Sequence, residues 1–303
     1  MYHTSVLLHE SIDYLAVKPG GSYVDATFGG GGHTRLILEK LGGKGHLYAF
    51  DQDMDAIQNA EEFSDNPAFT FVHSNFRFLK RHLRAEGLRA GSVQGILADL
   101  GVSSYQLDTA ERGFSYRFQA DLDMRMNRQE GQTAADVLNT YNAEELQRMF
   151  SELGEVRNSK TLALAIIRQR EQRFFKTTGD LTEFCENHLM GERMRYLSQV
   201  FQALRMEVND ELGALEDFLK DAYEMLAPGG RLAVITFHSL EDRMVKNFLK
   251  SGNVEGELEK DFYGNITRPW EPVTKKPVEP SDAELKVNNR ARSSKLRVAE
   301  KKK

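Results

Sequence analysis

Four consecutive glycines and a histidine, residues 29–33, are the part of this sequence that most clearly suggests chemistry. They follow a short apolar run over 22–26 and precede a helical pattern over 34–41. Glycines between a strand and a helix allow positive φ and let a ligand approach bare N–H groups. Asp51 ends the next apolar run, at the position where doubly wound folds bind ribose hydroxyls. The pattern predicts a site for a nucleoside-containing cofactor.

The kind of cofactor follows from what the turn lacks. No third glycine lies on the following helix, so the turn departs from the G-x-G-x-x-G fingerprint of pyrophosphate-binding folds. S-adenosylmethionine has no pyrophosphate and therefore fits the turn better than a nicotinamide does. Asp25 before the turn also favours a ligand site, and a tight loop without a ligand is the alternative. His33 is expected either to contact the cofactor through a ring nitrogen or to cap the helix.

A second acid, Asp99, follows the apolar run over 96–98 and is the candidate catalytic residue. The lone pair of an exocyclic amine in cytosine or adenine is delocalised into the ring. A carboxylate or carbonyl that accepts an N–H bond from this amine favours its nucleophilic form. The predicted reaction is transfer of a methyl group from S-adenosylmethionine to such an amine. Because the methyl donor is already a sulfonium, no metal is predicted. Positioning and electrostatics are expected to supply most of the rate of methyl transfer. Binding the cofactor or capping the loop are the alternative roles for Asp99.

Three further features of the sequence bear on the chemistry of the site. Phe76 follows the third apolar run, where its ring would either cover the adenine or belong to the core. The eight histidines show no metal-binding spacing with one another or with Cys185. Ser239 and Asp242 are interpreted as a helix cap, because the chain has no G-x-S-x-G motif for a hydrolase.

The elements that must position these residues alternate between strand and helix. Such alternation implies right-handed crossovers and an α/β fold with a parallel sheet. It stops over 105–202, where the pattern is helical, and resumes later. The sequence thus predicts a sheet domain, 1–104 and 203–303, with a helical insertion, 105–202, for substrate recognition. The predicted strands are 22–26, 47–51, 70–73, 95–100, 231–237 and, at the sheet edge, 295–299; the predicted helices are 34–41, 54–63, 76–86, 143–153, 159–171, 180–188, 197–204, 209–226 and 240–249.

Composition and charge narrow the class of protein. The chain has 303 residues, 40% hydrophobic and 28% charged, and a formal net charge of −5, which argues against a general nucleic-acid binder. Residues 286–303 hold eight basic residues and one acid, so this segment can contact phosphates, or it can be a solvated tail at 301–303. The single cysteine, Cys185, is expected in the core. Without a signal peptide or a membrane-length apolar run, a cytoplasmic location and no membrane partner are expected.

Eight motifs, in one order along nearly the whole chain, resemble the bacterial 16S ribosomal RNA cytosine-N4 methyltransferases of the MraW type. The resemblance implies a class I (Rossmann-like) methyltransferase sheet with an inserted all-helical domain. It implies S-adenosylmethionine as donor and N4 of cytidine 1402 in the decoding centre as acceptor. The motifs cover residues 4–8, 25–33, 99–104, 111–115, 122–126, 227–232, 237–242 and 290–294.

The resemblance also implies site residues and a partner. The family's cofactor contacts fall on Gly31, Gly32, His33, Asp51, Phe76, Asp99 and Gln106. The expected partner is 16S rRNA within the 30S subunit or a late assembly particle, and the protein is expected to be a monomer or a homodimer. Many relatives have proline where this chain has Tyr105, a departure that affects fine substrate contacts.

Residues that hold the target base must lie beyond Asp99, because base-reactive enzymes take the target atom out of the stack. Core packing is the alternative for the aromatic candidate Phe114, and ion pairing with nearby acids is the alternative for the arginines. A DNA amino-methyltransferase and a non-catalytic nucleoside-binding module are the competing functions. The substrate candidates are Tyr105, Arg112, Phe114, Arg125, Arg290 and Arg292.

Overall fold

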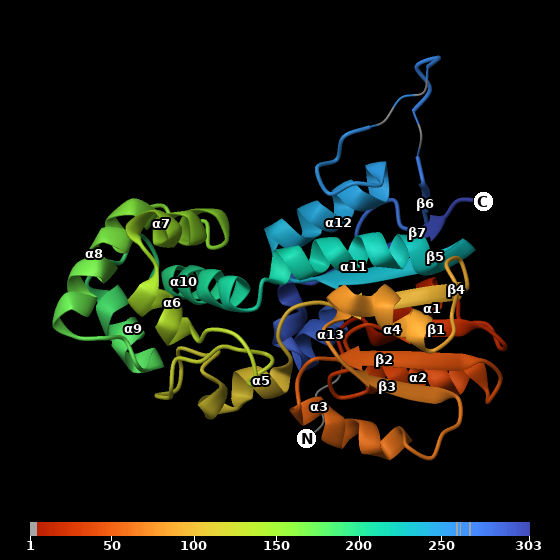
Figure 1. Ribbon diagram of the computed structural model, residues 1–303, viewed down its shortest axis with the longest axis horizontal. Helices are drawn as coiled ribbons and strands as arrows, with labels where there is room; N and C mark the ends of the chain where they lie inside the picture. The colour runs from red at the N-terminus through yellow and green to blue at the C-terminus, as the bar shows by residue number, and fades with distance from the viewer. Residues whose placement is uncertain (1–4, 259, 261, 267) are drawn as a thin grey trace. The chain divides into compact units, whose positions relative to one another are not determined.

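The computed structural model divides into two compact units (Figure 1). The sheet unit runs to Gly101 and resumes at Leu212, and the helical unit spans Val102–Glu211. The helical unit extends past the expected end at 202 because helix α10, Arg193–Val208, continues without a break. The structure describes residues 5–258, 260, 262–266 and 268–303.

The sheet unit is built on seven strands in the order β3-β2-β1-β4-β5-β7-β6. The first five are parallel, and β7 runs antiparallel to both β5 and β6. The order reverses between β1 and β4, so the ligand crevice is expected at the carboxyl ends of these two strands. The strands are β1 Ser22–Asp25, β2 His46–Asp51, β3 Phe69–His73, β4 Val93–Asp99, β5 Leu226–Thr236, β6 Trp270–Pro272 and β7 Lys295–Lys301.

Helices cover both faces of this sheet (Figure 1). Val24 and Ile96 pack in one core cluster with residues of α4, α11 and α12, whereas Tyr23 and Leu97 pack in another with residues of α1 and α2. This alternation is expected for strands buried on both faces. The helices are α1 Leu8–Leu15, α2 Gly32–Leu41, α3 Asp55–Ala60, α4 Leu79–Ala85, α11 Glu211–Met225, α12 Ser239–Ser251 and α13 Asp282–Val287, with short 3-10 turns η1 Glu61–Phe63, η2 Phe76–Phe78 and η4 Asn289–Ser293.

The carboxyl-terminal strand corrects two expectations. The segment 295–299 does not lie at the sheet edge, because β7 is inserted between β5 and β6. The edge is β6, whose Pro272 suits a strand with only one partner. Lys301 is not a solvated tail either. Its Nζ donates to the carbonyl oxygens of Tyr223 (2.6 Å) and Leu226 (2.9 Å).

A third difference concerns the start of β5. The helix before it ends at Met225, as expected, but the strand begins at Leu226 rather than at 231. The pairing passes from Val93 opposite Leu226 directly to Gly95 opposite Arg231. The residues 227–230 therefore form an irregularity inside β5 rather than a separate helix stop.

The helical unit packs around its own core. Four of its helices begin with reciprocal capping boxes, led by Ser103, Thr133, Asn142 and Thr177. Cys185 is fully buried in this core, as expected, and burial raises the pKa of its thiol to about 12. The helices are α5 Ser104–Asp108, α6 Ala134–Thr140, α7 Ala143–Glu152, α8 Ser159–Gln172, α9 Thr178–Glu186 and α10, with the 3-10 turn η3 Ala110–Arg112.

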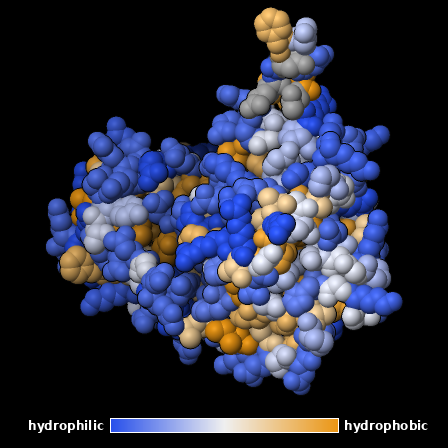
Figure 2. Space-filling view, turned by 45° about the vertical axis from the view of Figure 1, so that its right-hand side comes forward, coloured by the Kyte–Doolittle hydropathy of each residue, from blue (hydrophilic) through white to orange (hydrophobic). Residues whose placement is uncertain are grey.

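The face seen in Figure 2 is mainly hydrophilic, with scattered small apolar patches. Within the described ranges, no helix combines the length and the apolar character needed to cross a bilayer.

Candidate active site

The glycine turn joins β1 to α2 in a conformation that requires glycine at more than one position. Gly29 has φ 52° and Gly31 has φ 74°, both in the left-handed region. A Cβ on Gly31 would lie 2.9 Å from the ring of Phe63, whereas a Cβ on Gly29 or Gly30 would meet no atom within 4 Å. The turn is thus packed on one side and open on the other, as a ligand-binding turn must be.

Buried hydrogen bonds tie the turn to its neighbouring strand. Asp25 Oδ2 accepts from Thr34 Oγ1 (2.8 Å), and Asp25 Oδ1 accepts from the Thr27 amide (3.2 Å). Thr27 Oγ1 in turn accepts from the backbone N–H of Asp99 (2.6 Å). Asp25 is fully buried, and this burial raises its pKa to about 6. The end of β4 and the glycine turn therefore hold each other in place.

Asp51, at the end of β2, is held by backbone donors. Its Oδ2 accepts from Gly29 N (2.8 Å) and its Oδ1 from Asp53 N (2.8 Å). Burial raises the pKa of Asp51 to about 6 despite these two bonds. Each carboxylate oxygen accepts more than one hydrogen bond, so Asp51 retains the capacity to accept from a diol.

Asp99 is the acid with the most unusual surroundings. Its Oδ1 is buried and has no hydrogen-bond partner among the described residues. Burial, followed by the negative charges of Asp25, Glu241 and Glu284, raises the pKa of Asp99 well above its ordinary value. An unpaired carboxyl oxygen in such a negative environment fits a cationic ligand or a hydrogen-bond donor.

The His33 side chain points to the protein rather than away from it. The ring is buried, and its Nε2 donates to the Val6 carbonyl (3.2 Å). Burial lowers the pKa of His33 to about 4, so the ring is neutral at physiological pH. His33 therefore has an internal partner for its side chain, and its backbone lies in the first turn of α2.

Phe76 begins the 3-10 turn η2 after β3. Its ring is partly buried and contacts Phe218 edge-on, at 5.2 Å between centroids. Asn75 caps this turn by accepting from Arg77 N (2.9 Å). The ring is thus partly in the core and partly exposed at the carboxyl edge of the sheet.

Two of the predicted site residues lie on α5, the first helix of the helical unit. Gln106 is buried and completes a capping box, in which its Oε1 accepts from Ser103 N (2.9 Å) and Ser103 Oγ accepts from Gln106 N (3.1 Å). Tyr105 is 55% exposed on the first turn of the same helix. The sequence identified both positions, but not the capping role of Gln106.

Three substrate candidates are part of the framework of the helical unit. Arg112 is 2% exposed, and its Nη2 donates to the carbonyls of Arg125 and Met126, both at 3.1 Å. Phe114 is buried against the Arg112 guanidinium. Arg125 forms a two-point ion pair with Asp123 at 2.8 and 2.9 Å. The structure thus favours core packing for Phe114, which is buried in the helical unit, and ion pairing for Arg125, whose guanidinium is bound by Asp123.

Arg290 and Arg292 lie on η4, in the basic carboxyl-terminal segment of the sheet unit. Arg292 is exposed and Arg290 partly buried. Elsewhere in this segment Arg297 pairs with Asp242 at 2.7 and 3.0 Å. The segment is therefore only partly available to phosphates, and Arg292 is its most accessible arginine among the two candidates.

The helix cap expected at Ser239 is one residue earlier. His238 is the N-cap of α12, and its Nδ1 accepts from Glu241 N (3.4 Å). The Glu241 side chain is buried and accepts from Phe237 N (2.9 Å). The segment 237–242 is thus a helix start, as expected.

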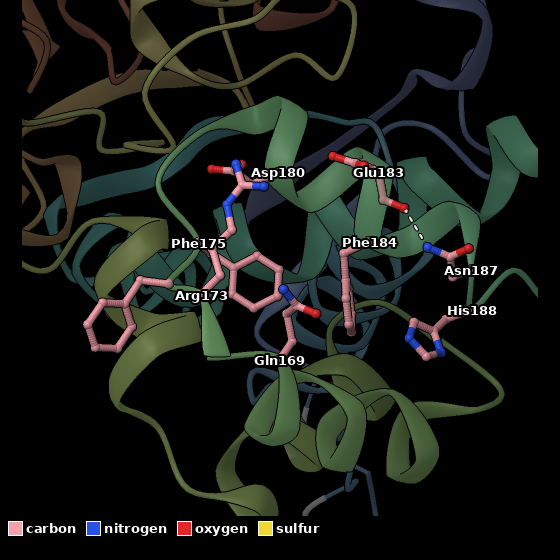
Figure 3. A pocket seen from close by; sticks show the side chains of 9 residues that line it. Gln169, Arg173, Phe175, Asp180, Glu183, Phe184, Asn187 and His188 are labelled. Atoms are coloured by element: carbon pink, nitrogen blue, oxygen red, sulfur yellow. Dashed lines mark hydrogen bonds and ion pairs between the residues drawn. The ribbon is translucent and has the colours of Figure 1, made fainter. Parts of the chain in front are cut away.

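A pocket of about 180 Å³ lies on the helical unit, between the end of α8 and α9 (Figure 3). Arg173 pairs there with Asp180, and the rings of Phe184 and His188 are 4.5 Å apart. None of the predicted site residues lines this pocket. Its lining residues belong to the helical unit, whereas the acids and glycines at the carboxyl edge of the sheet belong to the sheet unit.

The residues at that edge fit a nucleoside bearing a positive charge. Asp51 can accept from the ribose, Phe76 can face the base, and the acids around the unpaired Asp99 oxygen suit a sulfonium or an ammonium. The fold and this site define a class I, Rossmann-like methyltransferase whose cofactor is S-adenosylmethionine. The chain belongs to the MraW methylase family, whose sequence model matches residues 1–302.

Curated relatives are similar over nearly their whole length. The chain is 52% identical to "Ribosomal RNA small subunit methyltransferase H" of Parabacteroides distasonis, over 99% of this chain and 97% of the relative. It is 51% identical to the protein of the same name from Flavobacterium johnsoniae, over 99% and 98%. A solved rRNA methylase from Streptococcus thermophilus aligns with all of both chains at 14% identity and a TM-score of 0.43.

Several residues of this edge were not expected from the sequence. Thr27 and Thr34 link the glycine turn to Asp25, within the same segment, and Thr27 also links it to Asp99, 72 residues further on. The two hydroxyls were a usable signal, since Thr27 lies in the motif 25–33 and Thr34 follows it directly. Glu284 was not detectable, because its partner Leu7 is 277 residues away.

Proposed function

We propose that this chain transfers the methyl group of S-adenosylmethionine to the exocyclic N4 of cytidine 1402 in 16S rRNA, in the decoding centre of the small ribosomal subunit. The printed names of its relatives support an rRNA of the small subunit as substrate. The observation that carries the proposal is the buried, unpaired Oδ1 of Asp99 beside the glycine turn. That oxygen is an acceptor placed where an amine and a cation would meet.

The donor site is assigned to residues at three strand ends. Asp51 accepts from the ribose hydroxyls, Phe76 covers one face of the adenine, and the open side of the glycine turn receives the amino-acid end. When bound, S-adenosylmethionine supplies an electrophilic methyl on a sulfonium. Its positive charge opposes the causes that raise the pKa of Asp99, so the ionised carboxylate is favoured in the loaded site. The proposed cofactor contacts are Gly31, Gly32, His33, Asp51, Phe76, Asp99 and Gln106.

Asp99 is the proposed catalytic residue. As a carboxylate it accepts an N–H of the cytosine amine, which localises the nitrogen lone pair for attack on the methyl carbon. The nitrogen–carbon bond would form as the carbon–sulfur bond of the donor breaks and a neutral thioether leaves, and the Asp99 carboxylate, whose pKa is raised, would accept the proton that the amine loses. The backbone bond from Asp99 N to Thr27 keeps the carboxyl aligned with the turn, and positioning of this kind lowers the barrier.

The substrate contacts are proposed on the exposed candidates. Tyr105 offers an accessible ring for stacking on an unstacked base, and Arg292 an accessible charge for the phosphates. Arg112, Phe114 and Arg125 act indirectly, by maintaining the fold of the helical unit. The proposed partner is 16S rRNA within the 30S subunit or a late assembly particle, because the target lies in the decoding centre.

Labelled donor tests the proposal directly. The protein is incubated with tritiated S-adenosylmethionine and one of three acceptors: 30S particles, protein-free 16S rRNA or duplex DNA. We expect label in the RNA of the particles, recovered as N4-methylcytidine by mass spectrometry of the nucleosides. Label in DNA with none in 30S particles would establish a DNA amino-methyltransferase instead. Donor binding without transfer to any acceptor would indicate a non-catalytic module.

A further inference from the structure

The amino-terminal residues 5–7, called the strap below, are fastened to the sheet unit at two points. His33 Nε2 donates to the Val6 carbonyl (3.2 Å), and the Leu7 amide donates to Glu284 Oε1 (2.8 Å). His33 belongs to the first turn of α2 and Glu284 to α13, near the other end of the chain. The strap therefore links the amino terminus of α2 to a helix from the carboxyl-terminal segment.

The strap contacts the helix start that follows the glycine turn. A Cβ on Gly32 would overlap the hydroxyl oxygen of Ser5, so the strap lies directly against Gly32 and any larger residue there would displace the Ser5 hydroxyl. Gly32 is the first residue of α2, whose backbone N–H groups face outward from the helix end. Ser5 thus forms a wall beside the helix end that the proposed function assigns to the donor.

The conformation of Leu7 shows that the strap is held by its surroundings. Leu7 has φ 47° and ψ 38°, the left-handed region that a branched apolar residue rarely adopts. It is the N-cap residue of α1, but its side chain makes no cap hydrogen bond. Since Leu7 is fully buried and its amide is bound by Glu284, the strained backbone is fixed from both sides.

Glu284 also acts on the chemistry of the site through its charge. It is one of the three carboxylates whose negative charge raises the pKa of Asp99. Its own place is fixed, because Ser281 caps α13 by accepting from Glu284 N (3.2 Å) and Leu285 packs against the core. One side chain therefore fastens the strap and contributes to the negative field around the candidate catalytic acid.

We propose that Glu284 is a positioning residue for the donor site: it fastens the strap, and the strap fixes the glycine turn in its donor-binding geometry. This inference rests on the proposed function for the identity of the donor. It assigns the side chain of His33 to the same task, as the second fastening of the strap. RNA binding does not depend on Glu284 in this account.

Donor binding to the full-length protein without RNA tests the proposal. S-adenosylmethionine is titrated by calorimetry into the wild type and into Glu284→Ala, Glu284→Gln and Glu279→Ala. We expect Glu284→Ala to weaken the donor Kd by about tenfold, because the Leu7 amide loses its acceptor. Glu284→Gln keeps an oxygen acceptor and should recover most of this loss. Glu279 is exposed on the same segment, so Glu279→Ala should match the wild type.

Two further measurements separate positioning from general damage. Hydrogen exchange of the Leu7 amide should accelerate in Glu284→Ala, while core amides of β1 and β4 keep their protection. The Kd for protein-free 16S rRNA should stay within twofold of the wild type. A donor Kd unchanged in Glu284→Ala would overturn the proposal. So would equal losses of donor affinity, RNA affinity and core protection, because these indicate unfolding.

The failure of this inference differs from the failure of the proposed function. If the wild type binds no S-adenosylmethionine, the donor assignment itself is wrong. If the wild type binds the donor and Glu284→Ala binds it equally well, only the role of the strap is wrong.

Discussion

The charged side chains at the carboxyl edge of the sheet differ in their hydrogen bonding from the arginines of the helical unit. At the sheet edge, backbone donors and threonines fix Asp25 and Asp51, yet one buried oxygen of Asp99 has no partner in the described chain. In the helical unit, Arg112 and Arg125 direct their guanidinium groups to internal carbonyl and carboxylate oxygens. Among the described residues, Asp99 is the only one with a buried carboxylate oxygen that lacks a hydrogen-bond partner, and burial, together with the negative charges around it, raises its pKa, so a ligand that donates a hydrogen bond or carries positive charge is favoured at the edge.

The difference teaches that residue type alone does not reveal accessibility. In both regions, charged residues lie in the motifs on which the resemblance to the family rests. Only the sheet edge combines an open turn with an unsatisfied acid. The predictions below test whether the two regions differ in function as they differ in hydrogen bonding.

Replacing Asp99 should give the largest effect. Asp99→Ala removes the acceptor for the cytosine amine, and we expect kcat to fall by about 100- to 1,000-fold, as for loss of one preorganised charge-stabilising group. The 16S rRNA Kd should change little. Methyl transfer to 30S particles and RNA binding by filter retention are the two measurements. Full activity in this variant would remove Asp99 from catalysis.

Arg112→Ala should affect stability instead of chemistry. The change leaves two buried carbonyls without a donor and deletes a cation packed on Phe114, so we expect a loss of about 2–4 kcal/mol in the free energy of unfolding. Arg117→Ala is the matched control, since Arg117 is exposed in the same unit. Urea unfolding gives the comparison. A stable Arg112→Ala protein with weakened RNA binding would return Arg112 to the substrate site.

The pH dependence of donor binding should follow Asp51. Burial raises the pKa of Asp51 to about 6, so the carboxylate that accepts from the ribose is lost as pH falls below that value. From pH 7 to pH 5 we expect donor affinity to drop by about tenfold, and Asp51→Asn to bind more weakly with a smaller dependence on pH. His33, with a pKa of about 4, stays neutral in this range. If Asp51→Asn keeps the full dependence, Asp99 or Asp25, whose pKa values are also raised, is the responsible group.

The raised pKa of Asp51 also determines how the stability of the folded protein changes with pH. Asp51 has a pKa of about 6 in the folded protein and an ordinary pKa of 3.8 in the unfolded chain, so the folded protein binds this proton more tightly. The stabilisation from this group is therefore present below that value and is lost as pH rises through about 6. Thermal melts of the unliganded protein between pH 4 and 7 should show this loss, and it should be smaller in Asp51→Asn, in which Asp25 and Asp99 still have raised pKa values.

The smallest effect separates packing from backbone strain. Gly31 and Gly42 both have positive φ, but only a Cβ at Gly31 would meet neighbouring atoms, the rings of Phe63 and Phe28. Gly31→Ala should therefore cost about 1–2 kcal/mol more than Gly42→Ala. Chemical unfolding of the two variants measures the difference. Equal costs would show that the rings beneath the turn move aside freely.

The sequence was sufficient for the parallel core and for the residues at its edge. Apolar runs of four to seven residues alternate with helical patterns there, and an acid follows two of the runs, so Asp51 and Asp99 could be placed at strand ends. It was not sufficient for β6 and β7. The three-residue strand at Trp270 has no detectable period, and nothing local determines that 295–301 pairs between two other strands.

The roles of side chains were harder to predict from the sequence than the positions of strands and turns. Arg112 looks like an RNA-binding residue by type, and only the fold shows that it is buried. The bond between Leu7 and Glu284 joins residues 277 positions apart, a separation at which a single sequence contains no pairing signal. Long-range contacts of this kind depend on the completed sheet, whereas helix caps and glycine turns depend on neighbouring residues.

Cys185 has a practical consequence. It is the only cysteine of the chain, it is fully buried, and burial raises the pKa of its thiol to about 12, so it resists alkylating reagents in the folded protein. A cysteine introduced at an exposed position in each unit would then accept a fluorescent or spin label without removal of the native thiol. Distances between such labels would report how the two units move when donor and RNA bind.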